Sequence, residues 1–256
     1  MNDNIVGIIP AAGRGSRLAP FPCPKELFPV GYQDYKVNDT VVKRPKVVSQ
    51  YLVENMIQAG VTRIFFIIGE GKSDIMRYYG NGAAFGIDIC YLYQEELSGM
   101  PGALNLATPF IGDATVVFGM PDTIIEPADG LAQLLKKHLQ SSALLSLGLF
   151  QTDTPSKFGM VEIDKENNIT YTVDKPKETT LEHMWGCACW SADFTRLMDD
   201  YLKNNKYTGK EIVLGDVFND ALAKKLIVKG FPFDGGQYID IGTTDELDSA
   251  LKKFHL

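Results

Sequence analysis

A glycine-rich loop that carries several cations follows the first apolar run of the chain, residues 5–9. Gly13 and Gly15 have no Cβ, so the backbone can turn tightly there and approach a ligand closely. Consecutive backbone N–H groups in such a loop form a concavity that suits anions. The rim of the loop carries three cationic side chains: Arg14, Arg17 and Lys25. These residue types at this spacing predict a site that holds phosphates.

The loop differs from two common phosphate-binding motifs. No Gly-Lys-Ser or Gly-Lys-Thr closes it, so it is not a P-loop. No third glycine follows at the offset of the dinucleotide fingerprint, and the second predicted strand lacks an acidic residue in the ribose-binding position. A dinucleotide-dependent oxidoreductase is therefore the least favoured class of enzyme.

A carboxylate follows a buried strand in the middle of the chain. The apolar run 116–119 leads into Met120, Pro121 and Asp122. Ligands of open α/β sheets bind at the carboxyl ends of the strands, so Asp122 is expected to face a ligand. The alternative for this residue is a role in a turn or a helix cap.

Together these motifs resemble those of the sugar-1-phosphate nucleotidylyltransferases. The family pattern Gly-x-Gly-Thr-Arg-Leu stands here as residues 13–18, with Ser16 in place of threonine, and Pro-Lys-Glu stands at 24–26. The Pro-Ala-Ala-Gly opening and the Lys-Glu-Leu-Phe-Pro tail look most like the bacterial UDP-glucose pyrophosphorylases, with the thymidylyltransferases next. The resemblance covers residues 4–250.

The resemblance implies a magnesium site and two catalytic cations. Asp122 and Asp240 match the two family aspartates that hold Mg²⁺, and Tyr238 stands where the family usually has tryptophan. Two hard oxygen ligands together with nucleotide phosphates suit Mg²⁺, which keeps several waters. Arg17 would hold the β- and γ-phosphates, and Lys25 would neutralise charge around the α-phosphate.

Other family motifs imply which residues contact the substrates. Gln94 and Gly99 keep the five-residue spacing of the thymidylyltransferase-like members, and a glutamine can donate to and accept from one base edge. UTP or dTTP is therefore the expected nucleotide, with CTP less favoured. The implied nucleotide-binding residues are Ala12, Gly13, Gly15, Ser16, Gln94 and Gly99. The implied sugar-phosphate-binding residues are Gly159, Glu162, Lys175 and Gly186.

Strands and helices alternate over residues 1–150, the half expected to bind the nucleotide. This order favours an α/β fold with a doubly wound, Rossmann-like, mixed but mainly parallel sheet. A polar stretch with β-forming residues at 32–43 predicts a short hairpin inserted near the mouth of the site. The predicted strands are 5–9, 63–68, 87–93, 115–118 and 143–149. The predicted helices are 45–59, 73–79, 103–107 and 127–140.

Residues 151–256 predict a small β-rich lobe that binds the sugar phosphate. Its expected elements are a hairpin at 160–173, a strand at 186–190, helices at 192–204 and 216–225, and a last helix at 244–254. Strands at 227–231 and 238–241 are expected to close the sheet. Because no linker or repeat separates the halves, we expect a single nucleotidyltransferase domain over 1–256.

Composition narrows the class of partner. The chain has 256 residues, 45% of them apolar, and a net charge of −7, which argues against a nucleic-acid-binding surface. Four cysteines and three histidines show no zinc spacing, which predicts reduced thiols in the cytoplasm. No signal peptide and no membrane-spanning run are predicted, so no membrane partner is expected. The sequence leaves open whether the chain forms a homo-oligomer.

The expected reaction is attack of a sugar 1-phosphate oxygen on the α-phosphorus of an NTP, with pyrophosphate leaving. No Ser-His-Asp or Cys-His arrangement is present, and none is needed. One alternative is a glycosyltransferase that uses a nucleotide sugar, although Arg17 and Lys25 would then have no triphosphate to hold. The other is a non-catalytic regulatory module that binds sugar nucleotides, for which loss of Lys25 or of a metal aspartate would be typical.

Overall fold

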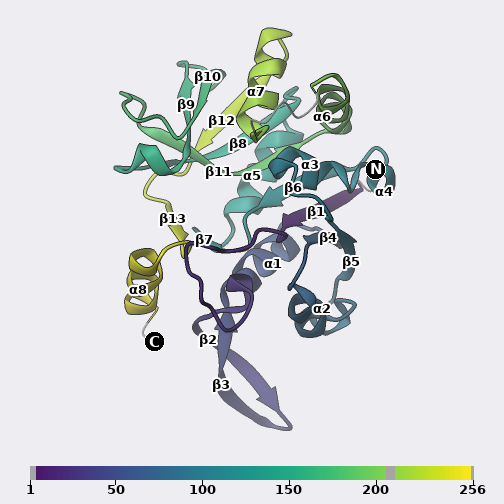
Figure 1. The fold of residues 1–256 in the computed structure, drawn as a ribbon, viewed down its shortest axis with the longest axis vertical. Coiled ribbons are helices and arrows are strands. Elements are labelled where there is room, and N and C mark those ends of the chain that lie inside the picture. Colours follow the sequence, from purple (N-terminus) through teal and green to yellow (C-terminus); the bar gives the residue numbers. More distant parts are fainter. Residues whose placement is uncertain (1–3, 206–210, 255–256) are drawn as a thin grey trace.

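A nine-stranded mixed sheet forms the centre of the computed structural model, which describes residues 4–205 and 211–254. The strand order is β10-β9-β11-β6-β1-β4-β5, and β8 pairs with both β11 and β12 (Figure 1). The β4, β1 and β6 region is parallel, whereas β11 runs antiparallel to β6, β8 and β9. This arrangement confirms the predicted fold class. The strands are β1 Ile5–Pro10, β4 Arg63–Ile68, β5 Asp88–Tyr93, β6 Thr115–Gly119, β8 Leu145–Gln151, β9 Gly159–Ile163, β10 Ile169–Asp174, β11 His183–Trp190 and β12 Val228–Pro232.

Helices cover both faces of this sheet because its central strands are apolar on both sides. Val6 and Ile8 of β1 lie in one hydrophobic cluster with α3, α6 and α7. Ile9, whose side chain points the other way, lies in a second cluster with α1, α2 and α5. The helices are α1 Val48–Gln58, α2 Ser73–Tyr79, α3 Gly99–Asn105, α4 Thr108–Ile111, α5 Gly130–Leu139, α6 Ala192–Asn204 and α7 Leu214–Ala223.

A separate two-stranded sheet corrects one prediction. The strand β13, Gln237–Asp240, does not close the main sheet but pairs antiparallel with β7, Thr123–Glu126. The sequence pattern missed β7 because this strand has four residues and directly follows Asp122. Ile124 of β7 packs in a third hydrophobic cluster with α8, Thr244–Lys253, and this burial holds β13 away from the main sheet.

Three predicted helices begin at least three residues from their observed starts. The first helix begins at Val48 instead of residue 45, because residues up to Val47 continue a strand. The helix predicted from residue 127 begins at Gly130, after β7. The helix predicted at 103–107 begins at Gly99, so Gly99 is its first residue.

The insertion at 32–43 forms a hairpin, as predicted, but a longer one. Its strands are β2, Pro29–Val37, and β3, Thr40–Val47, joined by a two-residue turn at Asn38 and Asp39. This ribbon projects away from the body of the protein (Figure 1). None of residues 32–43 lines the cleft described below, so its placement at the mouth of the site is wrong.

Candidate active site

The glycine-rich loop runs from the end of β1 to a short 3-10 turn, η1, at Lys25–Leu27. The Ala11 N–H donates to the Ile67 carbonyl at 2.7 Å, which fixes the start of the loop beside β4. Gly15 has a φ of +65°, a conformation that side chains with a Cβ rarely adopt. The sequence therefore places the loop at the carboxyl edge of the parallel strands, as predicted from the glycines.

Lys25 meets Asp122 at this edge. The Lys25 Nζ donates to Asp122 Oδ2, and both side chains are largely buried. Burial opposes the charge on Lys25, but the facing carboxylate of Asp122 outweighs it and raises the pKa of the ammonium. Lys25 is therefore a charged, largely buried donor at the wall of the site.

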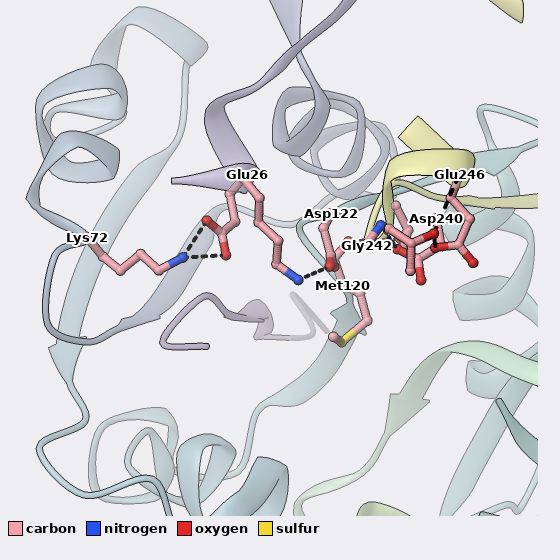
Figure 2. Close-up of polar contacts among 10 residues, drawn as sticks. Glu26, Lys72, Met120, Asp122, Asp240, Gly242 and Glu246 are labelled. Atoms are coloured by element: carbon pink, nitrogen blue, oxygen red, sulfur yellow. Dashed lines mark hydrogen bonds and ion pairs between the residues drawn. The ribbon is translucent and has the colours of Figure 1, made fainter. Parts of the chain in front are cut away.

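The pairing of β7 with β13 brings the two aspartates together. Asp240 lies opposite Thr123 in this ladder, and the Ile241 N–H donates to the Asp122 carbonyl at 3.1 Å. The Gly242 N–H donates to Asp240 Oδ1 at 2.8 Å. Burial, with the charges of Asp122 and Glu246, raises the pKa of the Asp240 carboxyl to about 6. Figure 2 shows Asp122 and Asp240 side by side.

This carboxylate pair fits a divalent cation. After burial, the nearby charge of Asp122 is the next cause of the raised Asp240 pKa, and a cation between the two carboxylates would offset that repulsion. Oxygen donors are the ligands that Mg²⁺ prefers. Among residues 4–205 and 211–254, no group of three or more His, Cys, Asp or Glu side chains gathers at one point, so the remaining ligands would be waters and substrate oxygens.

Arg17 lies on the β13 side of the site. A Cβ built on Gly242 would stand 2.9 Å from Arg17 Nη2 and 3.0 Å from Asp240 Oδ1, so the glycine allows the guanidinium to lie close. Lys157 donates to Glu246 Oε1 at 2.7 Å on the same side. Arg17 therefore lies near the second aspartate, and it does not line the two pockets of the cleft.

Two neighbouring pockets form a cleft along the loop. One, of about 320 Å³, is lined by predicted nucleotide-site residues from four segments of the chain. The other, of about 410 Å³, adds the far side of the loop and shares Ala12, Lys25 and Gln94 with the first. The predicted residues around the first pocket are Ala12, Gly13, Lys25, Gln94, Gly99 and Asp122. Gly15 lines the second pocket, whereas Ser16 lines neither.

Gln94 and Gly99 form part of the wall of the first pocket. Gln94 is buried at the end of β5, with its side chain at the cleft. Gly99 has a φ of +84°, and a Cβ there would stand 2.5 Å from the Ile212 carbonyl oxygen. Only glycine therefore allows the start of α3 to lie against residues 211 and 212.

The predicted sugar-phosphate residues lie on or next to strands β9, β10 and β11 of the main sheet, outside these two pockets. Gly159 packs beneath Trp185, since a Cβ there would stand 2.2 Å from its indole nitrogen, and Gly186 likewise packs beneath Tyr238. Glu162 is exposed and accepts from Thr170 Oγ1 at 2.7 Å. Their role in binding a sugar phosphate stays a prediction.

Lys175 directly follows β10 and has a backbone conformation that is unusual for a residue other than glycine. Its φ is +45°, and its N–H donates to the Phe158 carbonyl at 2.9 Å. Phe158 in turn packs edge-on against Tyr238 at a ring distance of 5.9 Å. Lys175 is exposed, and these two aromatic residues link its backbone to the β13 side of the site.

The sequence did not predict a buried ion pair next to Lys25. Lys72, from the loop after β4, donates to both carboxylate oxygens of Glu26 (Figure 2). Lys72 lines one pocket and Glu26 lines the other, so the pair forms part of the wall between them. The only sequence signals were the position of Glu26 beside Lys25 and a second glycine-rich segment at 69–72.

Comparison with known proteins defines the family. The model of the nucleotidyl transferase family matches residues 6–255. The chain therefore belongs to this family. It is 30% identical over 175 residues to the low-salt glycan biosynthesis nucleotidyltransferase Agl11 of Haloferax volcanii, covering 67% of this chain and 45% of that protein. It is 28% identical over 171 residues to the glucose-1-phosphate thymidylyltransferase of Streptomyces antibioticus, covering 66% and 44%.

The fold is also that of a solved structure. A Bacillus anthracis protein described as a glucose-1-phosphate thymidylyltransferase, in complex with sucrose, superposes with a TM-score of 0.83 at 24% identity, over 98% of this chain and 95% of that one. The chain spans about half the length of the two curated relatives named above. Within the part of the chain that the structure describes, no helix is long and apolar enough to cross a membrane.

Proposed function

We propose that this chain transfers a nucleotidyl group from an NTP to a sugar 1-phosphate, forming an NDP-sugar and pyrophosphate. The observation that carries the proposal is the convergence of Lys25, Asp122 and Asp240 beside the glycine-rich loop. Family membership and the names of both curated relatives support the same reaction.

The reaction needs positioning and charge more than covalent chemistry. An oxygen of the sugar 1-phosphate bonds to the α-phosphorus, the bond from that phosphorus to the bridging oxygen breaks, and pyrophosphate takes the electron pair. Lys25, buried and held charged by Asp122, donates to oxygens around the α-phosphate, where negative charge builds. The loop N–H groups bind the outer phosphates. When bound, Mg²⁺ would be held by Asp122 and Asp240 and would neutralise phosphate charge.

Gln94 sets the base preference in this proposal, and UTP or dTTP is favoured. Its amide can donate to O4 and accept from N3–H of uracil or thymine. A purine would have to displace the wall that Gly99 forms against residues 211 and 212. Uracil and thymine differ by one methyl group, worth only about 1–3 kcal/mol in a pocket, so the proposal covers both.

The sugar phosphate enters from the β-rich lobe in this proposal. Lys175 orients the attacking phosphate, and Gly159, Glu162 and Gly186 shape the sugar side. Arg17, which lies by Asp240, holds the outer phosphates of the nucleotide from the β13 side. A cytoplasmic location stays a prediction.

A pyrophosphate-release assay tests the function. Purified protein with Mg²⁺ is crossed with UTP, dTTP, CTP, ATP and GTP and a panel of sugar 1-phosphates, and products are identified by mass spectrometry. One accepted pair of substrates should give equal amounts of pyrophosphate and NDP-sugar.

The role of Lys25 is tested separately with the accepted pair. The variant Lys25→Ala should lower kcat by roughly two to four orders of magnitude, with a smaller change in the nucleotide KM.

Two outcomes would point to the alternative classes. Hydrolysis of a nucleotide sugar without any pyrophosphate step would indicate a glycosyltransferase. Binding of a sugar nucleotide with no turnover of any pair would indicate a regulatory module.

A further inference from the structure

The β2–β3 ribbon has unpaired edges. The strands pair from Tyr32 with Pro45 to Val37 with Thr40, and among the described residues no other strand joins them. An isolated two-stranded hairpin is only marginally stable in water, whereas three or more strands can support one another. A free edge is also a template for another strand. The projecting half of the ribbon therefore lacks the neighbours that usually stabilise such a structure.

Large apolar side chains on the ribbon are exposed to water. Tyr35 is 54% exposed and Val41 is 62% exposed, and Val37 is also exposed. Tyr35 lies directly opposite Val42, so these two side chains share one face of the ribbon. These residues lie beyond the end that packs on the body, where Gln33 bonds to Gln50 of α1. Tyr35, Val37 and Val42 therefore form an apolar row on one face of the distal ribbon, whereas Val41, opposite Lys36, is exposed on the other face.

The two edges differ in their ability to pair. Val37 and Thr40 flank a two-residue turn, so they form a hydrogen-bonded pair, and pairs alternate from there along the ladder. The alternation turns the backbone N–H and C=O groups of Asp34 and Lys36 outward on β2. On β3 it turns Val41, Lys43 and Pro45 outward, and Pro45 has no N–H to donate. The β2 edge, where Tyr32 also faces outward, is therefore the edge whose outward N–H donors are complete.

The charge pattern on the β2 edge is complementary to itself. Asp34 and Lys36 flank Tyr35, and these are the residues whose backbone groups face outward. If two copies of β2 pair antiparallel about a two-fold axis at Tyr35, Asp34 of each copy lies opposite Lys36 of the other. Opposite charges placed in this way stabilise a sheet. Asp34 also bonds Lys43 at 2.6 Å within its own ribbon, but this carboxylate is well exposed and its outer side stays open.

We propose that two copies of this chain associate through the β2 edges of their ribbons. The product is a four-stranded sheet in the order β3-β2-β2-β3, with a two-fold axis at Tyr35. One face then carries a continuous row of Val42, Tyr35, Tyr35 and Val42 from the two chains. Because the ribbons run antiparallel, the bodies lie at opposite ends of the new sheet, and the same patch serves both copies.

Variants that exchange the charges of Asp34 and Lys36 test the proposal. Sedimentation at several protein concentrations measures the dissociation constant of the dimer for each variant. Asp34→Lys leaves two cations flanking Tyr35, and Lys36→Asp leaves two anions, so each variant alone should have a dimer dissociation constant at least about tenfold above that of the wild type. A 1:1 mixture of the two variants should restore the dimer, as should the double exchange in one chain. Lys43→Ala, which removes only the partner of Asp34 within the ribbon, should leave the dimer intact.

A crosslink locates the two-fold axis. Tyr35→Cys should form a disulfide-linked dimer under mild oxidation, because the pair at the axis brings the two Cβ atoms together, whereas Tyr32→Cys and the wild type should not. Circular dichroism checks that each variant is folded. A wild-type monomer at about 100 μM, a dimer insensitive to both single exchanges, or a mixture that stays monomeric would overturn the proposal.

Discussion

The Lys72 ammonium donates to both carboxylate oxygens of Glu26, at 2.9 and 2.7 Å, and the two residues are 5% and 1% exposed. The pair ties the loop after β4 to η1, the turn that carries Lys25. Burial raises the pKa of the Glu26 carboxyl, and Lys72 only partly offsets this effect. A buried ion pair of this kind is stable as a whole but costly to break on one side.

Replacing one member of this pair should therefore destabilise the protein strongly. Lys72→Met leaves the buried Glu26 carboxylate without its hydrogen-bonded ion-pair partner, and the free energy of unfolding should fall by about 3–5 kcal/mol. The double variant Lys72→Met with Glu26→Met should recover most of this loss. Urea unfolding measures both. Lys252→Met, which breaks an exposed pair with Asp248, is the control and should match the wild type. A Lys72→Met protein as stable as the control would contradict the argument.

The two aspartates should be needed for metal binding more than for folding. Asp122→Asn and Asp240→Asn should each lower turnover by orders of magnitude at saturating Mg²⁺, because each removes ligand charge while keeping the shape of the side chain. Calorimetric titration with Mg²⁺ in the presence of the nucleotide should show weaker metal binding. Thermal unfolding should change little in Asp240→Asn, whereas Asp122→Asn also removes the partner of the buried Lys25 ammonium and should lower the unfolding temperature. Glu126→Gln, at the end of β7 farther from Asp122, is the matched control. Near-wild-type turnover in either aspartate variant would remove that residue from the site.

Gln94 should decide which base is accepted. In Gln94→Ala, kcat/KM should fall most for the preferred nucleotide, and the ranking of the five nucleotides should flatten. The reason is that polar groups built for one base edge reject others by leaving buried groups unpaired, at about 1–3 kcal/mol each. Glu96→Ala, two residues along, serves as the control because its side chain is exposed and lines neither pocket. A wild-type preference for ATP or GTP, or an unchanged ranking in Gln94→Ala, would place base recognition elsewhere.

Lys175 should act on the sugar phosphate and not on the nucleotide. Lys175→Ala should raise the KM for the sugar 1-phosphate at least about tenfold, which corresponds to one charge-assisted hydrogen bond. Nucleotide affinity, measured separately by calorimetry, should stay within error of the wild type. Lys177→Ala, an exposed lysine two residues away, provides the comparison. Equal weakening of both substrates would assign Lys175 to another part of the site.

His138 should make the protein sensitive to mild acid. It is buried on α5 with Nδ1 2.8 Å from Ser146 Oγ, and burial lowers the pKa of the imidazole to about 4. The unfolded chain, with a histidine pKa near 6.5, therefore binds this proton more readily than the folded chain. The stabilising contribution is complete above about pH 6.5 and is lost as the pH falls towards 4, by roughly 3 kcal/mol in total.

Chemical unfolding at pH 7.5, 6, 5 and 4.5 checks this expectation. The variant His138→Asn keeps a polar partner for Ser146 but cannot take up the proton, so its stability should fall less steeply over this range. Parallel pH curves for the wild type and the variant would rule out His138 as the sensitive group. Carboxylates contribute equally to both proteins, so the difference between the curves isolates the imidazole.

Local sequence was enough to predict the parts of this protein that depend on neighbouring residues. The apolar run before Gly13 and Gly15 predicted a buried strand followed by a tight loop, and both lie where expected, whereas anion binding by the loop stays a prediction. The alternation of strands and helices over residues 1–150 predicted the doubly wound sheet. The spacing of apolar residues along each segment shows whether it forms a strand or a helix and which of its faces are buried. The spacing of Gln94 and Gly99 predicted two residues that line one pocket.

Contacts between distant segments were decided only by the tertiary structure. β7 is four residues long and has no periodic signal of its own, yet its pairing with β13 is what brings Asp122 next to Asp240. Lys72 and Glu26 are 46 residues apart, and neither residue type predicts burial; they are buried because each neutralises the other. Such pairings depend on which segments the folded sheet places together, and this information lies in the packing of the whole chain.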